Sequence, residues 1–150
     1  MADFDSTRRV SRLQYEAYFL ARKYGEVQVD RQDGTWVHIK TFAIPAGWNK
    51  RSVQILIDIP HGTPGYPQVA PQWFWTDHDL RTVEGLPISH FFTEESSFSE
   101  ARYVSKGWGH FCIHLMKWHP STDMKRGHSL VSYLDLISMV FRDRKSLTRH

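Results

Sequence analysis

The sequence predicts a single α+β domain, with an N-terminal helix, a four-stranded antiparallel meander, a long loop and a C-terminal helix. Apolar residues recur at helical spacing near both ends of the chain, and they alternate with polar residues between these ends. Breaks rich in glycine and proline separate the alternating segments at hairpin-like intervals. Helices grouped apart from consecutive strands are typical of α+β domains, in which the helices cover one face of the sheet.

The N-terminal helix is predicted over residues 10–24, and Gly25 is its stop signal. The closing helix is predicted over residues 129–142, with Ser129 as its N-cap. Its apolar side chains form one face that would cover the sheet, and they are Leu130, Tyr133, Leu134, Ile137 and Phe141.

Four strands are predicted between these helices, at residues 26–30, 36–44, 52–59 and 72–76. The Asp33–Gly34 step indicates a hairpin between the first two strands. Residues 60–71 hold four prolines and two glycines, which predicts an irregular crossing segment. Residues 77–106 are less periodic and indicate a surface loop whose length favours a functional role.

Composition excludes several classes of protein. The 150 residues, 41% hydrophobic and 23% charged, suit one globular domain over residues 1–150, and we find no repeat or linker. Nineteen basic residues nearly balance sixteen acidic ones, so we expect no nucleic-acid partner. The basic clusters near both ends are interpreted as solvated ends or as a contact patch for an acidic protein.

The chain holds one cysteine, Cys112, so no intramolecular disulfide can form. The polar N-terminus does not resemble a signal peptide, and no apolar run approaches the roughly 18 residues that span a bilayer. We therefore expect a cytoplasmic protein with no membrane partner, in a compartment that keeps the thiol reduced.

Three motifs occur in a fixed order along the chain. Residues 55–75 combine an apolar strand, a Tyr66–Pro67 step followed by Pro71, and a second apolar strand. Residues 109–115 read Gly-His-Phe-Cys-Ile-His-Leu and contain the single cysteine. Trp118-His119-Pro120 then precedes the closing helix.

Together these motifs resemble the ubiquitin-conjugating enzyme superfamily, and more narrowly its prokaryotic members found beside activating enzymes and ubiquitin-like proteins. The resemblance covers about residues 36–141. It implies the ubiquitin-conjugating fold and a transferase in which Cys112 accepts a ubiquitin-like protein from an activating enzyme as a thioester. The modifier would then pass to a target protein, without a cofactor or a metal, and the bacterial resemblance implies a role in antiviral defence.

Two departures from the family pattern leave an alternative open. The His-Pro-Asn element that precedes the cysteine is replaced by Arg102-Tyr103-Val104-Ser105, and the aspartate often found two residues after the cysteine is His114. The asparagine is expected to shape the active-site loop and to stabilise the oxyanion of the attacked thioester. Its absence favours a non-catalytic module that binds a ubiquitin-like protein or an activating enzyme.

The chemistry of thioester transfer needs a thiolate, which is a minor species for an ordinary cysteine at neutral pH. In an extended segment, His110, Cys112 and His114 would share one face, with an imidazole on each side of the sulfur. These three residues are the predicted catalytic set: an imidazole would assist ionisation of the thiol or deprotonate the incoming amine.

Other interpretations of the same residues stay open. Between Phe111 and Ile113, Cys112 would also suit a small buried hydrophobic position. With His110, His114 and His119 it could bind zinc, although the spacing matches no common zinc motif. The aromatic run at residues 73–75 suits either core packing or partner docking, and two residues of the long loop, Phe91 and Phe92, are candidates to cover it.

Overall fold

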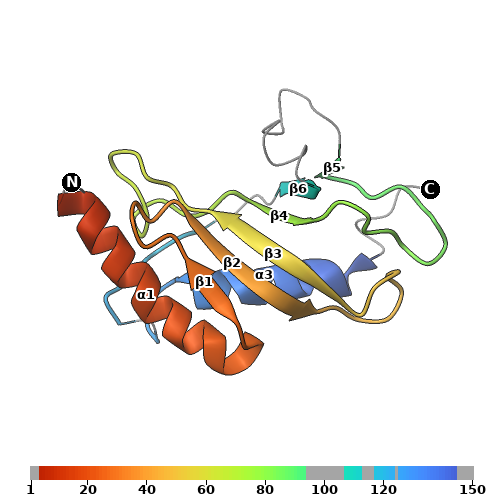
Figure 1. Ribbon diagram of the computed structural model, residues 1–150, viewed down its shortest axis with the longest axis horizontal. Helices are drawn as coiled ribbons and strands as arrows, with labels where there is room; N and C mark the ends of the chain where they lie inside the picture. The colour runs from red at the N-terminus through yellow and green to blue at the C-terminus, as the bar shows by residue number, and fades with distance from the viewer. Residues whose placement is uncertain (1–3, 94–106, 113–116, 124, 145–150) are drawn as a thin grey trace.

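The computed structural model describes residues 4–93, 107–112, 117–123 and 125–144 (Figure 1). Two helices and a six-stranded antiparallel sheet make up this part of the chain. In chain order the elements are α1 (Phe4–Tyr24), β1 (Val27–Val29), β2 (Trp36–Ala43), β3 (Ser52–Asp58), β4 (Trp73–Asp77), β5 (Phe91–Phe92), β6 (Trp108–Cys112) and α3 (Leu130–Arg142).

The sheet has six strands in the order β1-β2-β3-β4-β6-β5, so the predicted four-stranded meander is not confirmed. The prediction of four strands is wrong because β6 pairs along the whole of β4, from Trp73 with Cys112 to Asp77 with Trp108. The two-residue strand β5 then pairs with β6. Both additions join segments distant in sequence, and a strand of two residues is too short to show alternation.

Both predicted helices are present. The N-cap Ser129 of α3 is confirmed, because its side chain accepts a hydrogen bond from the backbone N–H of Val131, and Ser132 completes a capping box. Helix α1 begins at Phe4, earlier than the predicted start at Val10. The prediction missed the first turns because they are polar and carry no apolar period. Neither helix in the described part of the chain is long and apolar enough to cross a membrane.

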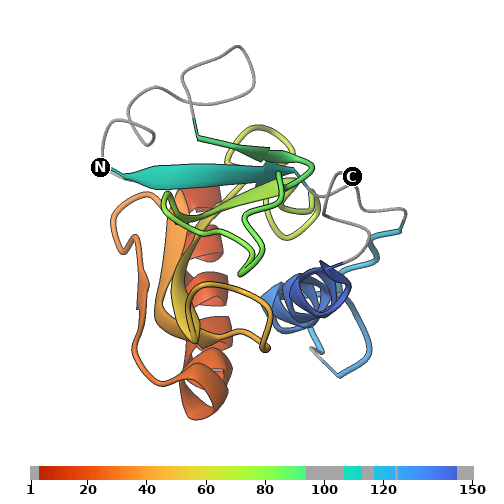
Figure 2. The same ribbon diagram turned by 90° about the vertical axis from the view of Figure 1, so that its right-hand side faces the viewer.

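Helix α3 covers one face of the sheet, and α1 packs against β1, β2 and α3 (Figure 2). Phe141 of α3 contacts the rings of Phe42, Phe74 and Phe111 from three different strands, at centroid distances of 5.9–6.2 Å. Leu13 and Leu20 bring α1 into the same core. Both helices and the sheet thus share one hydrophobic core among the described residues.

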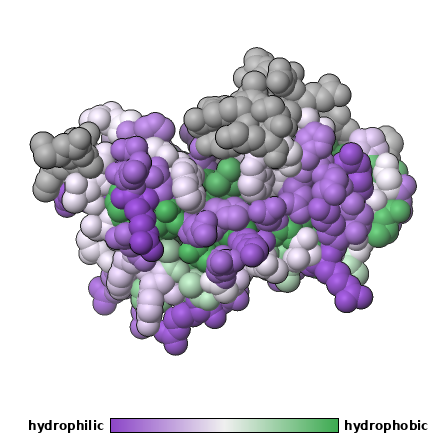
Figure 3. All heavy atoms as spheres, viewed as in Figure 1, coloured by the Kyte–Doolittle hydropathy of each residue, from purple (hydrophilic) through white to green (hydrophobic). Residues whose placement is uncertain are grey.

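The opposite face of the sheet has no helix over it among the described residues. A row of facing residues crosses this side of the strands, and it runs through His38, Leu56, Trp75, His110 and Phe92. Trp75 is fully buried there and Leu56 nearly so. Viewed as in Figure 1, small hydrophobic areas show between hydrophilic residues near the middle of the surface (Figure 3).

Candidate functional site

Strand β6 places the backbone of Cys112 at the end of a paired strand, opposite Trp73 of β4. Neither the Cys112 side chain nor His114 belongs to the described part of the chain. The same holds for Arg102–Ser105, where the family motif departs. The structure therefore locates the predicted cysteine by its backbone and leaves the exposure of its sulfur as a prediction.

His110, the second predicted site residue, lies two residues before Cys112 and is only 3% exposed. Its ring stacks on Trp75 with a centroid distance of 4.5 Å and an interplanar angle of 22°. The edge of Trp73 meets it at 5.6 Å, and Phe92 lies at 6.1 Å. The imidazole is thus held in an aromatic environment, with little access for bulk solvent.

On the other side of β6, phenylalanine rings stack on one another. Phe111 stacks on Phe74 at 5.2 Å, and Phe91 of β5 stacks on Phe111 at 4.6 Å. Gly109 makes room for Phe91, because a Cβ at this position would lie 2.3 Å from two atoms of its ring. Phe91 and Phe92, the candidates from the sequence to cover β4, do not lie directly beside it. They form β5, and β6 lies between β5 and β4.

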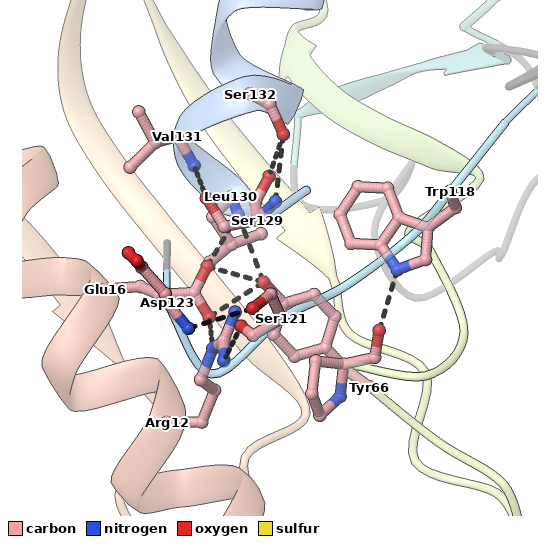
Figure 4. Close-up of polar contacts among 11 residues, drawn as sticks. Arg12, Glu16, Tyr66, Trp118, Ser121, Asp123, Ser129, Leu130, Val131 and Ser132 are labelled. Carbon is pink, nitrogen blue, oxygen red and sulfur yellow. Dashed lines mark hydrogen bonds and ion pairs between the residues drawn. The ribbon is translucent and has the colours of Figure 1, made fainter. Parts of the chain in front are cut away.

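Reasoning from the sequence missed Glu16, which lies at the centre of a buried network (Figure 4). Its fully buried carboxylate accepts hydrogen bonds from the Tyr66 hydroxyl at 2.6 Å, the Leu130 N–H at 2.6 Å and Arg12 Nε at 2.8 Å. Arg12 Nη1 donates to the Ser121 carbonyl at 2.7 Å. One carboxylate thus joins α1, the proline-rich segment and the start of α3.

Tyr66 keeps its proton in this network. Burial raises the pKa of its hydroxyl well above the usual value, and the negative charge of Glu16 raises the pKa further. The Tyr66 hydroxyl therefore donates to Glu16 throughout the physiological pH range. The Tyr66–Pro67 step of the sequence motif is in this way attached to α1.

The Trp118-His119-Pro120 motif is attached to the same proline-rich segment. Trp118 Nε1 donates to the Pro67 carbonyl at 2.7 Å, and the indole stacks on His128 at 5.5 Å. The His119 N–H donates to His128 Nδ1 at 2.8 Å. The backbone is therefore held on both sides of residues 113–116, by β6 before them and by Trp118 after them.

In the described part of the chain, no three His, Cys, Asp or Glu residues gather in a way that would hold a metal ion. The polar triplet at residues 77–79 has other contacts: Asp77 and Asp79 both pair with Lys50, at 3.0 and 2.5 Å. His78 Nε2 donates to the Thr93 carbonyl at 2.8 Å. The zinc interpretation depended on Cys112 and His114 and stays untested, since neither side chain is described.

Comparison with known proteins gives one result. A family model described as prokaryotic E2 family E matches residues 15–141, a stretch that includes β6 and every motif discussed above. No curated protein and no solved structure matches the chain.

Proposed function

The chain belongs to the prokaryotic E2 family, and from this premise we propose that it carries a ubiquitin-like protein as a thioester on Cys112 and transfers it to a target protein. Membership of this family indicates a role like that of a conjugating enzyme. The observation that supports the finer proposal is the place of the chain's single cysteine, at the end of a firmly paired strand and within the family match.

The proposed reaction has two steps. The Cys112 thiolate attacks the carbonyl carbon of the modifier's thioester on the activating enzyme, a new carbon–sulfur bond forms, and the donor thiolate leaves. A target amine then attacks the new thioester, the Cys112 thiolate leaves, and the amine proton passes to a base. Both steps need a sulfur that is ionised more readily than an ordinary thiol.

The two histidines would divide these tasks. His110 is almost fully buried, which supports a role in setting the ionisation and position of Cys112 rather than in meeting a large target. His114 stands where the family often has an aspartate, so we assign to it the general base that takes the proton from the amine.

The activating enzyme would dock on an exposed aromatic patch of α1, formed by Tyr15, Tyr18 and Phe19. These side chains are 54%, 64% and 37% exposed, and their rings meet edge to face at 5.1 and 5.5 Å. Exposed aromatic clusters are typical of surfaces that bind proteins. The patch lies on the described helix nearest the chain start and leaves β6 free for transfer.

A second function is favoured by the absent His-Pro-Asn element. A chain without the oxyanion-stabilising asparagine could bind the modifier or its activating enzyme without forming a covalent bond. This module would use the same fold, and it would leave Cys112 unmodified.

A loading assay separates the two functions. The protein is mixed with a candidate activating enzyme, ATP and a candidate ubiquitin-like protein, and adducts are resolved with and without reductant. We expect a reductant-labile adduct that Cys112→Ala abolishes and that Cys112→Ser converts into a reductant-resistant oxyester. Binding of either partner without an adduct would instead establish the non-catalytic module.

The pH dependence of the loading rate tests His110. If this imidazole favours the Cys112 thiolate, His110→Phe should move the rate profile to higher pH and preserve the maximal rate. Loss of rate at every pH with an unmoved profile would contradict this role. His119→Phe changes an imidazole outside β6 and serves as the control.

A further inference from the structure

A cavity of about 430 Å³ lies between the first half of α1 and the segment that joins β3 to β4. Three arginines of α1, Arg8, Arg9 and Arg12, line one wall. Residues 62–68 form the opposite wall, and Thr122 also lines the cavity. None of the lining residues is acidic, and none belongs to β6.

Arg9 is a buried cation held by neutral acceptors. It is 6% exposed, its Nε donates to the Gly34 carbonyl at 3.1 Å, and its Nη2 donates to the Asp33 carbonyl at 2.5 Å and to Ser6 Oγ at 3.3 Å. Within the described residues no carboxylate accepts a hydrogen bond from it. Because buried charges in proteins are normally paired with an opposite charge, this guanidinium favours an anion beside it.

Arg12 adds a second guanidinium, and one of its nitrogens has no acceptor among the described residues. Its Nε pairs with Glu16 and its Nη1 with the Ser121 carbonyl, but Nη2 is buried and has no acceptor among the described residues. The single charge of Glu16 is also shared with the Tyr66 hydroxyl and the Leu130 N–H. A buried N–H without an acceptor is unfavourable, so this nitrogen favours an acceptor beside it.

Two glycines show that the chain is closely packed around the cavity. A Cβ at Gly34 would lie 3.2 Å from Arg9 Nε, so this guanidinium rests closely on the hairpin turn. A Cβ at Gly65 would lie 2.9 Å from the Gly62 carbonyl oxygen, which shows how tightly the opposite wall turns. Close packing around a cavity favours recognition of a small ligand, because less backbone has to be ordered on binding.

We propose that this cavity binds a small phosphorylated molecule through the guanidinium groups of Arg8, Arg9 and Arg12. Phosphoryl oxygens accept paired hydrogen bonds from the planar guanidinium, and their multiple charge suits a lining of three cations without an acidic side chain. The volume lies in the usual range for small-molecule sites and exceeds the space that one phosphate needs. The ligand class is therefore a diphosphate or a nucleotide.

Titration calorimetry of the full chain with pyrophosphate tests the proposal. Arg8 and Gln68 line the cavity and are exposed, so their replacement should leave the fold intact. We expect Arg8→Gln and Gln68→Glu each to weaken binding about tenfold, because one removes a cation and the other adds a negative charge. Arg22→Gln removes an exposed arginine from the same helix outside the cavity, and it should bind as the wild type does.

The outcomes are distinct. Binding that weakens in both cavity variants, but not in Arg22→Gln, supports the proposal, as does the loss of affinity with added salt. No binding at millimolar pyrophosphate, or equal binding by all variants, would overturn it. A parallel titration with ADP identifies the source: tighter binding than pyrophosphate assigns the remaining volume to a nucleoside, and equal binding restricts recognition to the phosphates.

Discussion

Glu16 shows how one residue organises distant segments of the chain. Its carboxylate accepts three hydrogen bonds inside the protein, from groups that lie 4, 50 and 114 positions away in sequence. Arg12, whose side chain is 13% exposed, depends on it for charge compensation. The start of α3, the proline-rich segment and α1 therefore share one electrostatic anchor.

Replacement of Glu16 by glutamine should lower the free energy of unfolding by about 3 kcal/mol, because it leaves the buried Arg12 charge unpaired and removes an acceptor. Urea denaturation measures this loss. Glu26→Gln is the matched control: this side chain is 58% exposed, pairs with Lys40 at 3.3 Å, and should change stability by less than about 0.5 kcal/mol. Equal effects of the two substitutions would contradict the anchoring role.

The burial of Glu16 was readable in part from the sequence. Leu13, Glu16 and Leu20 follow helical spacing, so position 16 falls on the buried side of α1. What the spacing does not give is the set of partners. A hydroxyl from Tyr66 and a helix N-terminus at Leu130 reach Glu16 only through the tertiary fold.

At the scale of elements, β5 and β6 depend on the close approach of Phe91 to Gly109. Gly109→Ala should lower the free energy of unfolding by about 2 kcal/mol, because the added methyl group overlaps the Phe91 ring. Gly62→Ala is the control: its Cβ would meet only the Pro64 carbonyl oxygen at 3.8 Å. Thermal unfolding compares the stability of the two variants. If Gly109→Ala leaves the unfolding temperature unchanged, Phe91 of β5 does not pack against Gly109.

Helix α1 carries the proposed docking patch for the activating enzyme. Tyr18→Gln should raise the KM for the activating enzyme in loading by about tenfold and leave the maximal rate unchanged, because it removes contact area but no reacting group. Val83→Gln removes an equally exposed apolar side chain, at 64%, and should have no effect. A fall in the maximal rate with unchanged KM would place Tyr18 in the chemistry instead.

Element type could be predicted where the chain has a strong local period. Both helices and the strands β1 to β4 follow from helical spacing, alternation and turn residues. Strand β6 could not be placed in this way, because its partner β4 lies some thirty residues earlier and no turn signal joins them. The close contact between Phe91 and Gly109 depends on the same long-range strand pairing.

At the scale of the whole molecule, the candidate site is held by the phenylalanine core, by the Glu16 network and by Trp118. The phenylalanines around Phe141 fix β6 against α3, and the Glu16 network fixes the proline-rich segment against α1. Trp118 then joins that segment to the chain that follows the cysteine. Three motifs that are separate in sequence thus support the described backbone before and after residues 113–116.

The acceptor residue of the modifier tests the central claim most directly. The adduct of the wild-type protein is digested with trypsin under non-reducing, mildly acidic conditions, and the fragments are analysed by mass spectrometry. We predict that the C-terminal remnant of the ubiquitin-like protein is attached to the peptide from Gly107 to Lys117, through the Cys112 sulfur, and that hydroxylamine releases it. A remnant found on a lysine side chain, or a loaded Cys112→Ala protein, would contradict the account.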